Sequence, residues 1–288
     1  MSVHPALQNL IDRIGVPVER NTVLAGAVRT VYLAAGQGEP LVLLHGASSS
    51  GITWYPVIAA LAAHYRVLAP DMVGHGETDR PDGAYDRQYY SAWLAGFFDG
   101  IGLDSAHVMG HSLGGAVALQ FALQFPERVR RLVLVDAAAL GRGVPVSVAL
   151  AFLRSALFPS RAAGERIGQL AVYDPQKLDP FFEEYRRYTP VRQRPGRAFW
   201  RGGRTVAMVA TEDLQRLKPP TLIIWGREDR FLPVAHGGRA AEAIPNARLH
   251  VIPEAGHVSF LDQPQAFCQA VLEFLGEDDT KLEDNNAS

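Results

Sequence analysis

The stretch "VMGHSLGGAVALQFA" (residues 108–122) leads from a strand-like apolar run directly into a helix-like run, with Ser112 at the corner. Its pentapeptide "GHSLG" (110–114) fits G-x-S-x-G. A strand-to-helix turn this tight forces its central residue into strained geometry, and the flanking glycines remove side chains that would collide. The hydroxyl then stands at a helix N-terminus, where backbone amides favour negative charge. We interpret Ser112 as a nucleophile; the alternative is an ordinary N-cap before a glycine-tolerant helix.

Strand-like and helix-like segments alternate on both sides of this corner. The strand-like runs are 28–35, 40–45, 65–70, 106–110, 131–136, 221–226 and 248–252. The helix-like segments are 54–64, 88–102, 114–125, 235–243 and 264–275. Several strand-like runs are apolar without alternation, as expected for strands covered on both faces. The pattern predicts an α/β fold with a mostly parallel, doubly wound sheet of about eight strands, whose active site gathers at the carboxyl ends of the strands.

The alternation stops at residues 141–217, which contain helical patterns and no clear strand. This interval is too long for a loop inside a compact domain. We therefore predict a core made of residues 1–140 and 218–276 and a helical insertion at 141–217. Residues 277–288 form a polar, acidic tail that is expected to fray.

The composition excludes several classes of function. With 28 basic and 30 acidic residues, the chain has no basic excess to neutralise nucleic-acid phosphates. Its single cysteine, Cys268, rules out an internal disulfide. No stretch reads as a membrane span or a signal peptide. We expect a soluble, cytoplasmic protein that binds neither nucleic acid nor membrane; whether it forms a homodimer is left open.

The serine needs partners, because a hydroxyl is a weak nucleophile near neutral pH without a base and an acid that orients the base. For this type of corner the chain order is Ser, acid, His. Asp229 follows the strand-like run 221–226, and His257 follows the run 248–252. Both are therefore expected where loops converge at the carboxyl edge of the sheet. We predict that Ser112, Asp229 and His257 form a catalytic triad.

Other residues are weaker candidates for the same roles. Asp136, at the end of run 131–136, is the alternative acid, and Glu228 is a third candidate. Three other histidines are less suited to act as the base, because one directly neighbours the serine at the corner and two are better explained as loop-bracing residues. These are His111, His45 and His75.

Acyl chemistry also needs hydrogen-bond donors aimed at the tetrahedral oxyanion. The amide of Leu113, which follows the serine, is one donor by construction. The second is expected in the loop "HGASSSG" (45–51), where we select the amide of Ala47. The alternative is that this loop is a plain Gly/Ser connection.

Apolar residues in the insertion are candidates for the substrate pocket. Phe152, Leu153, Leu157 and Phe158 lie in the helix-like segment "VSVALAFLRSALF" (146–158) and would line an acyl pocket. The alternative is that this helix stripe belongs to the core. No G-x-G-x-x-G follows a strand-like run, and neither GxxxxGK nor HExxH occurs, so we expect no cofactor and no metal.

Five motifs together resemble the α/β-hydrolase fold family over residues 25–275. In chain order they are "HGASS" (45–49), "DMVGHGETDRP" (71–81), "GHSLGG" (110–115), "GREDRFLP" (226–233) and "PEAGHVSFLDQP" (253–264). The resemblance implies that residues 141–217 are a cap domain. It also implies nucleophile, acid and base roles for the predicted triad, and oxyanion-hole roles for Ala47 and Leu113.

The resemblance points to two reactions. A serine at the corner differs from haloalkane dehalogenases and epoxide hydrolases, which have aspartate there. "GHSLGG" is similar to carboxylesterases and lipases, whereas residues 60–81 resemble the C–C hydrolases that cut ring-cleavage products of aromatic compounds. Those C–C hydrolases typically have Asn before the serine, a "GGGPG"-like oxyanion loop and often Trp after the histidine. Here His111, "GASSSG" (46–51) and Val258 occupy these positions.

We therefore predict a serine hydrolase that cleaves small-molecule carboxylic esters through an acyl-enzyme. The alternative reaction is C–C bond hydrolysis of meta-cleavage products. A different class of function is a ligand receptor built on a hydrolase scaffold, with the triad inactive or slow.

Overall fold

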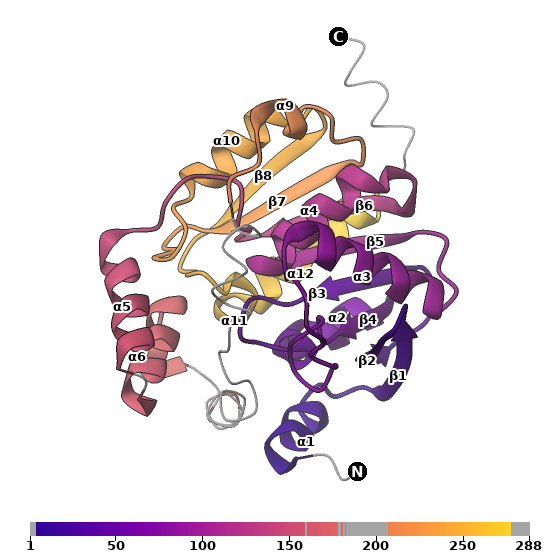
Figure 1. The fold of residues 1–288 in the computed structure, drawn as a ribbon, viewed down its shortest axis with the longest axis horizontal. Coiled ribbons are helices and arrows are strands. Elements are labelled where there is room, and N and C mark those ends of the chain that lie inside the picture. The colour runs from indigo at the N-terminus through magenta and orange to yellow at the C-terminus, as the bar shows by residue number, and fades with distance from the viewer. Residues whose placement is uncertain (1–3, 159, 178–179, 181, 183–206, 278–288) are drawn as a thin grey trace.

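The computed structural model describes residues 4–158, 160–177, 180, 182 and 207–277. Eight strands form one sheet in the order β1-β2-β4-β3-β5-β6-β7-β8 (Figure 1). They are β1 (Glu19–Ala25), β2 (Val28–Ala35), β3 (Pro40–Leu44), β4 (Arg66–Pro70), β5 (Ala106–His111), β6 (Val129–Val135), β7 (Thr221–Gly226) and β8 (Ala247–Ile252). The β1–β2 and β2–β4 pairs are antiparallel, and the others are parallel. The mostly parallel sheet predicted from the sequence is confirmed.

Helices cover both faces of this sheet. They are α1 (Pro5–Asp12), α2 (Tyr55–Ala62), α3 (Arg87–Gly100), α4 (Leu113–Gln124), α10 (Ala235–Ala243) and α12 (Pro264–Leu275). In β6, Leu132 and Leu134 pack in one apolar core with α3, α4 and α10. Val133 and Val135 pack in the other core with α1, α2 and α12. Because both faces are covered, β5 and β7 are buried along their whole length, which explains why neither shows an alternation of apolar and exposed polar residues.

The sequence patterns did not identify β1. Most of its residues are exposed or partly exposed, so the strand has no apolar run. It lies at the edge of the sheet and joins β2 in a hairpin at Gly26, where φ is +61°. An edge strand that is open to solvent needs few apolar residues, and hydrophobic periodicity therefore misses it.

Between β6 and β7 the described residues are helical rather than extended. They include α5 (Val146–Leu157), α6 (Arg161–Ala171) and α9 (Thr211–Leu214). α5 and α6 lie side by side and to one side of the layers that cover the sheet (Figure 1). The domain boundaries near residues 141 and 217 stay a prediction, and most of the predicted tail (278–288) lies outside the described residues.

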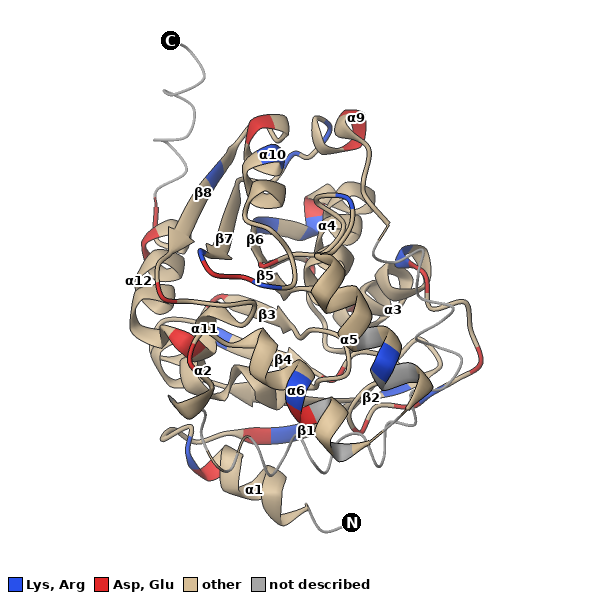
Figure 2. Ribbon diagram, turned by 90° about the vertical axis from the view of Figure 1, so that its left-hand side faces the viewer, with Lys and Arg blue, Asp and Glu red and all other residues tan. Residues whose placement is uncertain are grey.

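Charged residues of both signs are interspersed over the described elements (Figure 2). Arg131 is buried, and its guanidinium donates to the carbonyls of Phe274 and Glu277, which ties the end of α12 to β6. Within the described ranges, no helix combines the length and the apolar character needed to cross a bilayer. The cytoplasmic location stays a prediction.

Two glycines allow a test of the packing. Gly36 follows β2 at φ +74°, and a methyl group on it would overlap the backbone oxygens of Ala62 and Tyr65. Gly15 has φ +80° with open space around it. Gly15→Ala adds only backbone strain and should lower the free energy of unfolding by about 1 kcal/mol. Gly36→Ala adds a clash and should lower it by roughly 3 kcal/mol. Urea unfolding measures both, and equal losses would contradict the packing.

Candidate active site

Ser112 lies between the end of β5 and the first residue of α4, with φ +52° and ψ −113°. This is the strained geometry that the sequence predicts for the corner. A methyl group on Gly110 would overlap the Gly114 carbonyl, and one on Gly114 would overlap the Leu44 carbonyl at the end of β3. The Ser112 hydroxyl makes no capping hydrogen bond to α4. The N-cap alternative therefore does not describe this side chain.

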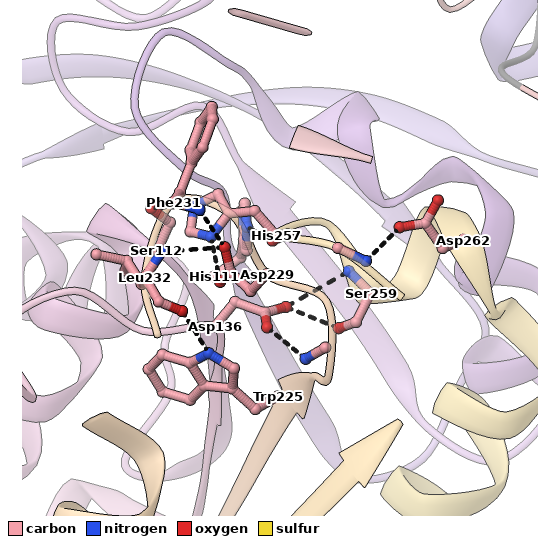
Figure 3. Close-up of polar contacts among 12 residues, drawn as sticks. His111, Ser112, Asp136, Trp225, Asp229, Phe231, Leu232, His257, Ser259 and Asp262 are labelled. Atoms are coloured by element: carbon pink, nitrogen blue, oxygen red, sulfur yellow. Dashed lines mark hydrogen bonds and ion pairs between the residues drawn. The ribbon is translucent and has the colours of Figure 1, made fainter. Parts of the chain in front are cut away.

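The hydroxyl faces His257 instead (Figure 3). Ser112 Oγ lies 3.0 Å from Nε2 of His257, which follows β8. Nδ1 of the same ring lies 2.8 Å from Oδ2 of Asp229, which follows β7. The other oxygen of Asp229 accepts hydrogen bonds from the amides of Phe231 (2.7 Å) and Leu232 (3.0 Å). The structure thus brings together the three side chains predicted as a triad, at the carboxyl ends of β5, β7 and β8.

The charges of these groups are suited to proton transfer. The Asp229 side chain is fully buried and that of His257 nearly so. Burial opposes a charged ring, but the Asp229 carboxylate and its hydrogen bond raise the pKa of His257 above its ordinary value. In the neutral ring, the proton on Nδ1 is donated to Asp229. Nε2 is then free to accept the proton of the Ser112 hydroxyl.

The loop that carries His257 is held by neighbouring segments. The Gly256 amide donates to Oδ2 of Asp262 at 2.8 Å, at the end of α11 (Ser259–Asp262). The Val258 amide donates to the carbonyl of Ala171, the last residue of α6, at 3.2 Å. A methyl group on Gly256 would lie 2.8 Å from the same Ala171 oxygen, so this close approach requires glycine. α6 therefore contacts the loop of the imidazole directly through backbone atoms.

The other histidines make different contacts. Nε2 of His111 donates to the carbonyl of His257 at 2.8 Å, and burial, together with the nearby His257 ring, lowers the pKa of His111 to about 3. The His45 ring accepts from the Met72 amide at 3.0 Å. His75 donates from Nδ1 to a backbone carbonyl at 3.2 Å in its own loop. His45 and His75 brace loops, as the sequence indicates, and His111 is a neutral donor.

The alternative acids also contact other groups. Asp136 lies 2.7 Å from the Ser259 hydroxyl. Glu228 accepts a hydrogen bond from the Ala255 amide at 3.1 Å. Of the three carboxyls, Asp229 is the one that binds the imidazole. Among the described residues, no group of three His, Cys, Asp or Glu side chains is arranged to hold a metal ion.

Of the two amides predicted as an oxyanion hole, that of Leu113 directly follows Ser112 in the chain, and that of Ala47 lies in a loop that packs against the corner. Leu113 is the first residue of α4, so its amide has no acceptor within the helix. Ala47 is exposed in the loop after β3. The preceding Gly46 packs against the corner, since a methyl group on it would lie 2.8 Å from Nδ1 of His111 and 3.4 Å from Cβ of Ser112. The oxyanion role of both amides stays a prediction.

The predicted pocket residues lie on α5 and at its end. Leu153, Leu157 and Phe158 are 49%, 63% and 70% exposed. The side chain of Phe152 lies outside the described residues. The exposure of the three described side chains shows that they do not belong to the packed core, which was the alternative. Their contact with a substrate stays a prediction.

Three side chains near the site were not selected from the sequence. The Phe231 ring centroid lies 4.9 Å from that of His257. Ser259 contacts Asp136, and Asp262 holds the Gly256 amide. The strand and loop pattern locates the segments that carry them. Their contacts depend on the conformations of loops, for which the sequence carries no periodic signal.

Comparisons with known proteins show the family and the fold. The family model described as alpha/beta hydrolase fold matches residues 39–264. The 2-hydroxy-6-oxo-2,4-heptadienoate hydrolase of Pseudomonas putida is 36% identical over 272 residues, which cover 89% of this chain and 96% of that protein. A structure of the meta-cleavage product hydrolase of Pseudomonas fluorescens has a TM-score of 0.79 at 31% identity, covering 88% of this chain and 97% of its own. The naproxen esterase of Bacillus subtilis shares the fold, with a TM-score of 0.82 at 24% identity, covering 96% of this chain and 100% of its own.

The pairing of Asp229 with the imidazole can be tested without any substrate. Asp229→Asn removes the charge that raises the pKa of His257, so this pKa should fall by at least about one unit. Glu228→Gln, at the adjacent position, is the matched control and should leave it unchanged, because Glu228 binds the Ala255 amide. Ring NMR signals of His257 followed against pH measure both variants. An unchanged pKa in Asp229→Asn would contradict the geometry.

Proposed function

Because this chain belongs to the alpha/beta hydrolase fold family, whose members catalyse many reactions, we propose its reaction from the site and the relatives together. We propose a serine hydrolase that cleaves the carbon–carbon bond beside the 6-oxo group of 2-hydroxy-6-oxo-dienoates. The observation that carries the proposal is the 3.0 Å contact between Ser112 Oγ and His257 Nε2. The choice of substrate follows the Pseudomonas putida relative, which is 36% identical across almost its whole length.

The first half of the reaction forms an acyl-enzyme. His257 accepts the Ser112 proton on Nε2 while Oγ attacks the 6-oxo carbon, and Asp229 stabilises the imidazolium that results. The carbonyl oxygen becomes an oxyanion, bound by the amides of Ala47 and Leu113. Each such donor contributes about 3 kcal/mol to stabilising the transition state in comparable sites.

A carbon leaving group needs a place for its electron pair. In the 2,6-dioxo tautomer of the substrate, carbon 5 is a methylene conjugated through a double bond to the 2-oxo group. When the bond between carbons 5 and 6 breaks, its electrons therefore move to the 2-oxo oxygen, which takes the proton from the imidazolium of His257. The product is a 2-hydroxydienoate. Water, deprotonated by His257, then hydrolyses the acyl group from Ser112 and releases a carboxylic acid.

Cleavage of a carboxylic ester is the second candidate. It uses the same acyl-enzyme but expels an alcohol, which needs no conjugated electron acceptor. The observations in its favour are the departures from the C–C hydrolase pattern at His111, Val258 and the loop 46–51. The esterase in the comparison is 24% identical and supports the fold alone. The relatives thus support C–C cleavage over the ester cleavage that "GHSLGG" favours.

Measuring turnover of a dienoate and of an ester by the same protein distinguishes C–C cleavage from ester cleavage. The wild-type protein should turn over 2-hydroxy-6-oxo-2,4-heptadienoate with a kcat/KM at least about a hundredfold above that for p-nitrophenyl butyrate. Loss of the dienolate absorbance and release of nitrophenol measure the two rates. The opposite ranking would favour the esterase, and tight binding of either compound without turnover would favour the receptor alternative.

Ser112→Ala tests the chemistry itself. It removes the nucleophile and should lower kcat for the preferred substrate by at least about a thousandfold with the fold intact. Ser105→Ala is a suitable control, because this serine lies in the loop before β5, at the opposite end of that strand from Ser112. Full activity in Ser112→Ala would place the reaction elsewhere in the molecule.

A further inference from the structure

Asp136 is a buried carboxyl that the reaction above does not use. It directly follows β6, and no part of it is exposed. Its φ is +44°, a region that Asp and Asn adopt more readily than most residues other than glycine. In Figure 3 it lies beside the trio of Ser112, Asp229 and His257. Burying a carboxyl at a residue with positive φ costs free energy, so its contacts must compensate for this cost.

Its contacts join the loops that carry the acid and the base. Oδ1 accepts a hydrogen bond from the amide of Gly226, the last residue of β7, at 2.7 Å. Oδ2 lies 2.7 Å from the hydroxyl and 3.4 Å from the amide of Ser259, at the start of α11. Asp229 follows Gly226 closely in the chain, and Ser259 closely follows His257. One side chain therefore fixes the ends of both segments relative to β6.

The charge of Asp136 follows from its surroundings. Asp229 accepts two backbone amides and the imidazole N–H. Asp136 has one amide at 2.7 Å, a second at 3.4 Å and the Ser259 hydroxyl at 2.7 Å, which can either donate to the carboxyl or accept from it. Two buried carboxylates near a single imidazole repel each other and lose solvation, so one of them keeps a proton. Asp229 has the stronger set of donors, because the imidazole N–H is one of them. Asp136 is then the carboxyl that stays neutral.

The titratable groups around Asp136 support this assignment. They are Asp229 from the loop after β7 and His257 from the loop after β8; His111 of β5 lies next to His257, with ring centroids 5.0 Å apart. Burial, and then the Asp229 carboxylate, raise the pKa of Asp136 well above its ordinary value. If Asp136 were ionised, its charge would raise the pKa of His257 further. At neutral pH more of the His257 rings would then already be protonated, and a protonated ring cannot accept the serine proton.

We propose that Asp136 is a positioning residue that stays protonated while the triad works. It acts as a neutral carboxyl, which ties β7 and the His257 loop to the end of β6 without adding a second negative charge. Only its effect on activity rests on the proposed serine-hydrolase function. The protonation state and the contacts belong to the folded protein and can be measured without a substrate.

The first test uses Asp136→Asn, which copies a neutral carboxyl in shape and also tolerates positive φ. If Asp136 is already neutral, the pKa of His257 measured by ring NMR should differ from that of the wild type by no more than about 0.3 unit. If Asp136 is ionised, removing its charge should lower the pKa of His257 by about one unit or more, and that result would overturn the proposal.

Infrared spectra at pH 7 give an independent measurement. The wild-type protein should show a protonated-carboxyl band that is absent from Asp136→Asn. Asp71→Asn is the matched control: burial raises the pKa of Asp71 to about 6, and this carboxylate accepts the amides of Gly51 and Glu77 in another part of the fold. At pH 7 its loss should leave the band in place. A wild-type spectrum without the Asp136 band would overturn the proposal.

Measurements of kcat/KM show whether Asp136 acts through its hydrogen bonds or through its charge. Asp136→Asn should keep kcat/KM within about threefold of the wild type, whereas Asp136→Ala, which cannot bind Gly226 or Ser259, should lose at least about tenfold. Equal losses in both variants would show that the charge is needed. If Asp136→Ala does not fold, the NMR and infrared results for Asp136→Asn still decide. If Ser112→Ala retains full activity, the proposed function is wrong. The protonation of Asp136 is still decided by the NMR and infrared spectra.

Discussion

The backbone turn at Ser112 is the constraint on which the rest of the site depends. A residue with positive φ at the junction of β5 and α4 is held there only because Gly110 and Gly114 leave room for the neighbouring carbonyls. The same crowding brings the end of β3, and therefore the loop that contains Ala47, against the corner. The parallel sheet then delivers Asp229 and His257 to the same edge, since their strands end side by side. The strained residue is thus packed against the end of β3, and the ends of β7 and β8 bring its two partners to it.

Few of the buried side chains at the carboxyl edge of the sheet need to carry a charge. His111 is neutral because it is buried, and it donates its one ring proton to the His257 carbonyl. Asp229 accepts hydrogen bonds from two amides and from the imidazole. A second ionised acid would be costly in a site so poorly exposed to water. The arrangement leaves the His257 ring as the group whose protonation can change during a reaction.

The fold and the central trio could be predicted from sequence, and the physical reasons are specific. Strands buried on both faces appear as unbroken apolar runs, and the ends of such strands locate Asp229 and His257 without any side-chain information. β1 was missed because an exposed edge strand needs no such run. The partners of Asp136 and the place of Phe231 were missed because they depend on loop geometry. The expectation of ester cleavage came from "GHSLGG" and from the departures from the C–C hydrolase pattern, whereas similarity over 89% of the chain supports C–C cleavage.

The backbone contact between Val258 and Ala171 has a consequence for how such a protein can diversify. α6 is not independent of the sheet domain, because the carbonyl of its last residue, Ala171, accepts a hydrogen bond from the loop that carries His257, where Gly256 leaves no room for a side chain. Replacing α6 with a foreign helix would disturb the position of the His257 ring unless the new helix placed a carbonyl where that of Ala171 lies. The end of α6 and the placement of the imidazole are therefore coupled in this architecture.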